Sequence, residues 1–494
     1  MRIRLIILII FYFLSINFLA AQSTYDFNAN SKKAYEAIIA LNFKQGQELI
    51  NKEKRENPDN LIPYFLENYM DVLPILFNGE QQLFSERKTA LQERIDLLKK
   101  GDSNSPWHLY TQAAVYFHWA AAYIRMNERT RGALHFRRFH NLAQKNQETF
   151  PGFAPNEVLL GVEEALIGTL PSTYQWLANV LGFKGDLKNG IATVKKIALN
   201  NQNTILQEEA FYFYCYLDFY LGKNREYVWM QVKKRNKDLP HNHLFNYIVA
   251  NMALDDQKAD DAIRVLQARK KDTNYIPLHF FDYQLSLAYI HKIDSRAVGN
   301  MERFMRNYKG DLFLKNAYQK LSLYYYAIGA NEKARSLKNS IPQIGSNLID
   351  ADKQANRFAE QTAFPNRNLI RVRLKNEGGF TMDALNEISQ INPNSLKKED
   401  ELLEYYFRFA HIYEQLENNQ AALLFYERCI KAGKNSKEQF PARSALHIAE
   451  IYENAKKYSL AKKYYELCLS MKNHDFQSNI DQKAKSGLHR LSNY

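Results

Sequence analysis

The stretch that decides the fold is AHIYEQLENNQAALLFYERCI, residues 410–430. It can be laid without a gap on AEIYENAKKYSLAKKYYELCL, residues 449–469, and the two segments are identical at eight of 21 positions. The offset between them is 39 residues. Because a fixed offset with matching small and aromatic residues is typical of a structural repeat, the segments predict two consecutive copies of one helical unit.

Small and aromatic residues recur at helical spacing inside each copy. In the first copy Ala410 and Tyr413 are three residues apart, Ala422 and Tyr426 are four apart, and ENNQ lies between the pairs. Small residues let two antiparallel helices approach closely, and the rings fill the space between neighbouring hairpins. The pattern resembles the tetratricopeptide repeat. The resemblance implies an all-α fold, an α-solenoid of antiparallel helical hairpins that forms a right-handed superhelix.

The same spacing of small residues continues toward the N-terminus. Two small residues twelve positions apart occur four more times, as Ala34 with Gly46, Ala120 with Gly132, Ala250 with Ala262, and Ser322 with Ala334. We therefore expect a degenerate helical-repeat region at 22–346. An irregular repeat or a bend is expected at 347–400, where FPNRN and NEGG dilute the pattern, and regular repeats with a capping helix are expected at 401–494.

The first residues predict export. Arg2 and Arg4 precede an apolar run from Leu5 to Ala21, which is short for a bilayer span of about 20 residues. This pattern is typical of a signal peptide, here at 1–21, and an uncleaved anchor is the alternative. The sequence contains no Asn-x-Ser or Asn-x-Thr, the motif that eukaryotic secretion glycosylates. We therefore expect the periplasm or the outer membrane of a Gram-negative-type bacterium.

Charge and cysteine content exclude several classes of protein. The net charge of +13 is spread over the chain, and its short basic runs are separated and flanked by acids. This distribution is typical of solvated helix ends, so no nucleic-acid partner is expected, and peripheral contact with the outer membrane or envelope glycan fits the basic bias better. The three cysteines, Cys215, Cys429 and Cys468, are too few and scattered for a disulfide scaffold. We expect them to be small core residues.

No catalytic, cofactor or metal site is expected. His241 and His243 form a His-x-His without a third ligand at helical spacing. Glu163 and Glu164 are adjacent on a predicted helix, so their carboxylates diverge by about 100° and should lie on a solvated face rather than form the facing pair of a glycosidase. No region interrupts the repeats for the hundred or so residues of a catalytic module. The chain is therefore not expected to be an enzyme.

Repeat solenoids normally bind through the groove formed by the first helix of each hairpin. The resemblance to the tetratricopeptide repeat implies eight inward positions, namely Glu404, Phe407, His411, Glu414, Arg443, Leu446, Glu450 and Glu453. Phe407 and Glu450 stand where some tetratricopeptide domains carry a Lys/Asn clamp for a peptide carboxylate, which argues against that clamp. Packing or plain solvent exposure is the alternative for each position.

A second resemblance covers residues 113–198. The features that carry it are a helix with Gly161 and Gly168, Leu170-Pro171, Tyr174, Trp176, and the turn Gly182-Phe183-x-Gly185-Asp186. This span resembles a tetratricopeptide family whose eukaryotic members are linked to the mitochondrial outer membrane, associate with lipid and take part in inclusion-body clearance. The resemblance brings no catalytic residue with it. Gly182 is expected to end a helix that begins at Pro171, and Asp186 to cap the next one.

These features favour a non-enzymatic scaffold that binds a protein or peptide partner in the cell envelope. The alternative is a lipid-associated or peptidoglycan-acting envelope protein built on the same α-solenoid.

Overall fold

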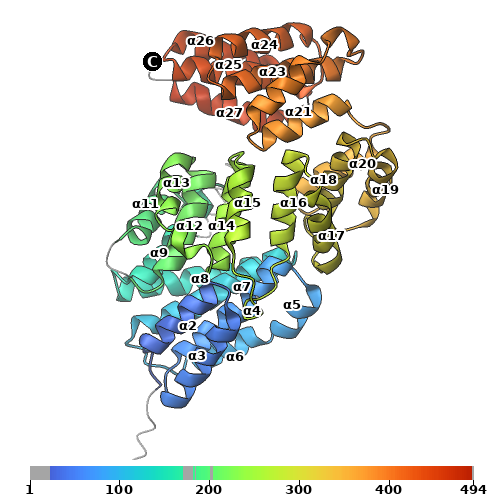
Figure 1. Ribbon diagram of the computed structural model, residues 1–494. Coiled ribbons are helices and arrows are strands. Elements are labelled where there is room, and N and C mark those ends of the chain that lie inside the picture. The colour runs from blue at the N-terminus through green and yellow to red at the C-terminus, as the bar shows by residue number, and fades with distance from the viewer. Residues whose placement is uncertain (1–22, 171–181, 184, 201–203, 475, 492–494) are drawn as a thin grey trace, which may run out of the picture. The chain divides into compact units, whose positions relative to one another are not determined.

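The computed structural model describes residues 23–170, 182–183, 185–200, 204–474 and 476–491 (Figure 1). Within these ranges the regular structure is helical, and the β-structure amounts to two isolated bridges, Ser23 with Gly101 and Thr24 with Asn60. The all-α class is thus confirmed. None of the described helices has the length and apolar character of a membrane span. The proposed signal peptide and the predicted helix from Pro171, with Tyr174 and Trp176, lie outside the described residues.

The chain divides into two compact units, which are described separately. The first comprises Met1–Met252, Val265–Phe280 and Tyr308–Gly310. Its helices are α2 (Ala29–Ile39), α3 (Phe43–Glu56), α4 (Ile62–Asn78), α5 (Gln81–Arg87), α6 (Ala90–Leu98), α7 (Pro106–Arg125), α8 (Arg129–Thr149), α9 (Ala154–Gly168), α11 (Leu187–Ala198), α12 (Gln207–Tyr216), the π-helix Leu217–Leu221, α13 (Arg225–Lys233), the 3-10 helix Asn236–Asp238 and most of α14 (His243–Asp255).

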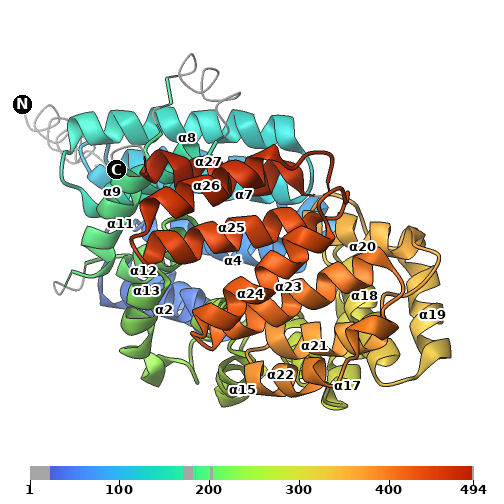
Figure 2. The same ribbon diagram turned by 90° about the horizontal axis from the view of Figure 1, so that it is seen from above.

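The second unit comprises Ala253–Arg264, Phe281–Asn307 and Asp311–Tyr494. Its helices are the first part of α15 (Ala259–Ala268), α16 (Phe280–Lys292), α17 (Arg296–Asn307), α18 (Leu314–Ala327), α19 (Asn331–Ser340), α20 (Asp350–Glu360), α21 (Arg367–Glu377), α22 (Thr381–Ser389), α23 (Glu399–Gln415), α24 (Asn419–Ala432), α25 (Gln439–Asn454), α26 (Tyr458–Ser470) and α27 (Gln477–Arg490), with 3-10 helices at Ile341–Gln343 and Pro393–Ser395. Figures 1 and 2 show α23 to α26 as neighbouring helices, and each contacts the next.

Within each unit, the small residues found by spacing lie where two consecutive helices touch. Ala34 with Gly46, Ala120 with Gly132 and Ser322 with Ala334 each have one member on each helix of a hairpin, and all six residues are buried. A Cβ on Gly46 would lie 2.5 Å from the Ile38 side chain. Ser322 Oγ donates a 2.7 Å hydrogen bond to the carbonyl of Ala334. The recurrent small residues are therefore explained by close contact between antiparallel helices.

Gly182, Phe183 and Asp186 have the expected local chemistry. Gly182 has φ +84°, a left-handed conformation that glycine adopts without steric cost. Phe183 is buried. The Asp186 side chain accepts a 2.9 Å hydrogen bond from the backbone N–H of Asn189, so it caps α11 as predicted. The glycines of this stretch belong to helix ends and close helix contacts.

The two C-terminal hairpins share one internal hydrogen bond. The buried hydroxyl of Tyr426 donates to Glu414, twelve residues earlier, and Tyr465 donates in the same way to Glu453. The repeat thus places the same Glu–Tyr pair in both hairpins. All three cysteines are buried and unpaired, which confirms the expectation of core cysteines, and burial raises the pKa of Cys429 to about 12.

Candidate functional site

The inner positions predicted from the repeat lie on α23 and α25. Two of them are core residues, because Phe407 is 1% and Leu446 3% exposed. Phe407 contacts Tyr426 and Phe440 with ring centroids 5.8 and 5.6 Å apart. These two side chains therefore fill the space between hairpins and do not line a groove, which corrects their assignment as groove residues.

The Glu453 carboxylate is occupied by hydrogen bonds within the repeat region. It accepts a hydrogen bond from the Tyr465 hydroxyl, and the Arg490 guanidinium of α27 donates one to each of its oxygens, at 2.7 and 2.8 Å. These bonds lower the pKa of Glu453, the bonds from Arg490 contributing most. Its carboxylate joins the last hairpin to α27 and has little capacity left for a partner. Glu450 is more open, with its side chain 40% exposed.

Two arginines on the same face stand close to acids and rings. Arg408 Nε donates a 3.1 Å hydrogen bond to Glu404 Oε1, and both side chains are largely buried. The Arg443 guanidinium lies over the Phe407 ring, 4.5 Å from its centroid. Burial, followed by repulsion from Arg408, lowers the pKa of Arg443. The inner face therefore carries charged groups that have lost part of their hydration.

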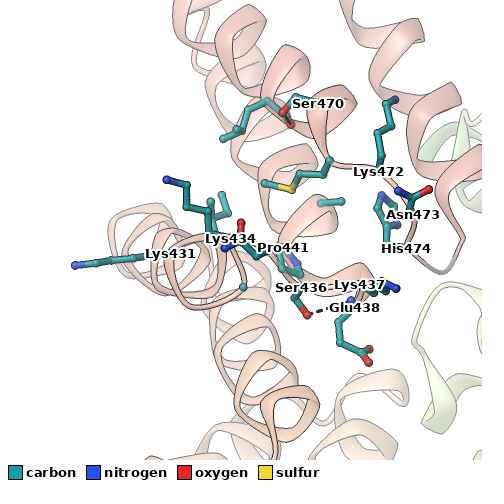
Figure 3. Close-up of a pocket in the computed structure, with 16 residues that line it drawn as sticks. Lys431, Lys434, Ser436, Lys437, Glu438, Pro441, Ser470, Lys472, Asn473 and His474 are labelled. Carbon is teal, nitrogen blue, oxygen red and sulfur yellow. Dashed lines mark hydrogen bonds between the residues drawn. The ribbon is translucent and has the colours of Figure 1, made fainter.

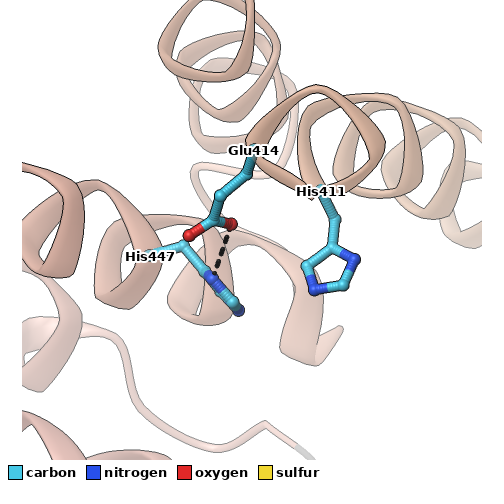
Figure 4. Close-up of side chains that lie close together, drawn as sticks. All are labelled: His411, Glu414 and His447. Atoms are coloured by element: carbon cyan, nitrogen blue, oxygen red, sulfur yellow. Dashed lines mark ion pairs between the residues drawn. The ribbon is translucent and has the colours of Figure 1, made fainter. Parts of the chain in front are cut away.

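Three side chains with metal-ligand chemistry meet on this face (Figure 4). His411 and Glu414 come from α23 and His447 from α25, and one ligand atom of each lies within 4.8 Å of the others. His447 Nδ1 is 3.0 Å from Glu414 Oε2. Burial, with repulsion from His447, lowers the pKa of His411 to about 3, so its imidazole is neutral at pH 7. Such a set can accept protons, donate hydrogen bonds or coordinate a cation.

Sequence reasoning found His411 and Glu414 but missed His447. The first two are three residues apart on one helix, a spacing that puts them on one face. His447 occupies the repeat position of Arg408, 39 residues later. The repeat pattern contained a signal for His447. Because the first helices of consecutive repeats lie side by side, a histidine on the first helix of the next repeat could have been predicted to lie near His411 and Glu414.

A separate cavity of about 540 Å³ lies at one end of the last hairpins. It is formed by the α24–α25 connection and the segment after α26, and Figure 3 shows lysine side chains coming from both. Its lysines are Lys431, Lys434, Lys437 and Lys472, and its lining includes one acid, Glu438. Apolar atoms of Pro441 and Met471 contribute to the wall. The composition suits an anionic ligand with an apolar part.

The His-x-His pair does not form a metal site with a third ligand in the described residues. His243 is buried, stacks on Tyr275 with centroids 3.7 Å apart, and has Nε2 2.9 Å from the Lys270 carbonyl. Burial lowers its pKa to about 4. His241 is exposed. His243 is therefore a packed, hydrogen-bonded histidine.

The predicted solvated face for Glu163 and Glu164 is wrong at Glu163. Glu163 is 4% exposed, with Oε1 2.8 Å from His140 Nδ1. Burial raises the pKa of Glu163 to about 8 and lowers that of His140. The sequence did not indicate that α8 covers this side of α9. Glu164 is half-buried, and the two carboxylates do not form a facing pair.

Comparison with known families agrees with the C-terminal geometry. Residues 403–433 and 442–475 match the model of the tetratricopeptide repeat. The C-terminal region contains tetratricopeptide repeats. The first match includes α24 and most of α23, and the second includes α26 and most of α25, so the face that holds His411 and His447 is formed by the first helices of two consecutive repeats.

Two solved structures are similar to the chain at low identity. The tetratricopeptide domain of P58(IPK) is 13% identical, with 83% of this chain and 96% of that chain covered and a TM-score of 0.22. The hetero-tetramer Cut9–Hcn1 of the APC/C is 12% identical, with coverage of 93% and 95% and a TM-score of 0.23. Curated protein sequences gave no match, so the resemblance of residues 113–198 to the inclusion-body-clearance type stays a prediction.

Proposed function

We propose that the chain is an exported, non-enzymatic helical-repeat scaffold that binds a protein or peptide partner in the cell envelope. The observation that carries the proposal is the inner face of α23 and α25 in two consecutive tetratricopeptide repeats. The partly buried side chains on this face are Arg408, His411, Arg443 and His447. Polar groups that have already lost part of their hydration bind a complementary partner at a smaller desolvation cost than fully solvated groups. The apolar N-terminal run is the support for export.

The chemistry of this face defines the partner in part. Arginines are enriched at the centres of protein interfaces, and Arg443 is held over Phe407 without an ion pair of its own among the described contacts. Glu450 offers an exposed acceptor nearby. A segment that carries a carboxylate or amide for Arg443 and a donor for Glu450 fits this face.

The test is capture of partners from envelope extract by the immobilised full chain, followed by mass spectrometry. We compare the wild type with Arg443→Glu on the inner face and with Arg428→Glu, whose side chain is exposed on α24. Circular dichroism checks that both variants are folded. One stoichiometric protein that is lost with Arg443→Glu and retained with Arg428→Glu supports the proposal. Equal capture by both variants contradicts the assignment of this face, and recovery of lipid alone contradicts the scaffold.

The lysine-lined cavity favours a second function, association with an anionic lipid or envelope glycan. Several lysines near one another attract a negatively charged surface, and the apolar wall can accept part of an acyl chain or sugar ring. Flotation with vesicles containing anionic lipid tests lipid binding, with Lys434→Glu/Lys437→Glu as the variant.

Release of muropeptides from purified peptidoglycan, with Glu163→Gln and Glu164→Gln as controls, tests a glycan-cutting activity, and no release excludes it.

A further inference from the structure

The cluster of His411, Glu414 and His447 has the ligand types of a transition-metal site. Zn²⁺ binds imidazole nitrogen and carboxylate oxygen at about 2.0 to 2.2 Å, and two histidines with one glutamate leave a position for water or another ligand. The ligand atoms here come from two neighbouring helices and lie within 4.8 Å of one another. The set is therefore a candidate metal site on chemistry as well as on position.

The surroundings of His411 orient its ring as a metal ligand needs. Its Nδ1 lies 3.1 Å from the side-chain nitrogen of Asn376. Asn376 is 1% exposed, and its Oδ1 has no hydrogen-bond partner among the described residues. Because amide oxygen and nitrogen exchange places when the group turns by 180°, Oδ1 can accept from Nδ1–H. That arrangement fixes the neutral tautomer with Nε2 open to a metal, as partners of metal-bound histidines commonly do.

The other two ligands are held by the repeat itself. Glu414 Oε2 accepts a 2.6 Å hydrogen bond from the Tyr426 hydroxyl and lies 3.0 Å from His447 Nδ1. The His447 ring stacks on Tyr426, with centroids 5.3 Å apart and planes 16° apart. Ligand atoms in a tetrahedral zinc site are about 3.3 Å apart, given the usual bond lengths. Glu414 and His447 are already close to this spacing, and the set closes when its more distant atoms approach by about 1 to 1.5 Å.

Charged groups around the cluster tune its affinity. Arg408 and Arg443 repel a cation. Glu404 and the Glu377 carboxylate of α21 attract it, and so does Glu450, whose Oε2 lies 4.0 Å from His447 Nδ1. The Arg408 charge is paired with Glu404.

We propose that His411, Glu414 and His447 bind one divalent transition-metal ion, best matched by Zn²⁺, which joins the first helices of two consecutive repeats. Mg²⁺ is disfavoured because it prefers oxygen ligands in octahedral geometry. The site goes beyond partner binding, since the ion would cross-link α23 to α25 with or without a partner present.

Calorimetric titration of the metal-free full chain with ZnSO₄ tests the proposal. We expect one site per chain, at least tenfold weaker binding for His411→Gln and for His447→Gln, and unchanged binding for His241→Gln, an exposed histidine outside the cluster. MgSO₄ should give no such isotherm. Absence of zinc binding, or equal binding by the cluster variants and His241→Gln, overturns the site.

A measurement on the wild-type chain tests the metal site even if the variants do not fold. X-ray absorption at the zinc edge of the one-to-one complex should show two imidazoles, and a spectrum with oxygen ligands alone overturns the proposal. Partner capture with and without chelator keeps the two ideas apart. If the partner is still captured in the presence of chelator, the scaffold proposal is supported independently of zinc. If zinc binds and no partner is captured, the metal site is supported independently of the scaffold.

Discussion

Ionisation of the buried Glu163 carboxyl should make the protein less stable as pH rises. Burial on α9 beside His140 raises its pKa from 4.5 to about 8. Below about pH 4.5 both the folded and the unfolded chain hold this proton, and the contribution is fully present. Between about pH 4.5 and 8 the unfolded chain has released the proton and the folded chain has not, so the free energy of unfolding falls as pH rises.

The magnitude follows from the size of the pKa shift. Each pKa unit corresponds to about 1.4 kcal/mol, so a shift from 4.5 to about 8 removes up to roughly 4 to 5 kcal/mol across the window. Glu163→Gln keeps a donor for His140 Nδ1 and cannot ionise. We therefore expect the variant to match the wild type near pH 5 and to become more stable than the wild type by up to about 1.4 kcal/mol for each further pH unit.

The assay is urea denaturation followed by circular dichroism at pH 5, 6, 7 and 8 for the wild type, Glu163→Gln and Glu148→Gln. Glu148 is exposed on α8 and serves as the control, with no pH-dependent difference expected. His140 is present in all three proteins, so its own titration cancels in the comparison to first order. A difference between wild type and Glu163→Gln that stays flat from pH 5 to 8, or a variant that is less stable at pH 8, refutes the reasoning.

Three further predictions follow from packing. Gly190→Ala should lower the free energy of unfolding in the urea assay by about 1 to 3 kcal/mol, because the new Cβ would lie 2.5 Å from backbone atoms of α9. The control is Gly299→Ala, a helical site where the nearest atom, at the tip of the Arg303 side chain, is 3.7 Å away. This variant should be neutral or more stable by up to about 1 kcal/mol. Phe407→Ala should lower the free energy of unfolding by about 3 to 5 kcal/mol. Leu424 is 51% exposed, so Leu424→Ala should change it by no more than about 0.5 kcal/mol. Similar losses of stability for both variants would contradict the assignment of Phe407 to the core. The three buried cysteines should react with a thiol reagent only after denaturation, as absorbance at neutral pH would show, and rapid labelling of the folded chain would disprove their burial.

The hairpins could be predicted because their determinants are local. Ala410 and Ala422 are near in sequence, and their size and spacing are enough to indicate two helices in close contact. The cap at Asp186 was predictable for the same reason, since its side chain bonds a backbone group three residues later. The candidate site was predictable only in part, because the repeat pattern assigns positions to the inner face without saying which side chains are covered there.

What lies against a side chain was not predictable from the sequence. The sequence alone determined the all-α class, the helix pairs and the burial of the small residues, because helical periodicity and steric size are properties of short segments. The tertiary structure decided that α8 buries Glu163, that Phe407 fills the core, and that His447 meets His411 and Glu414. The physical reason is that burial, pKa and ligand geometry depend on groups far apart along the chain, whose distances are set only when the helices have packed.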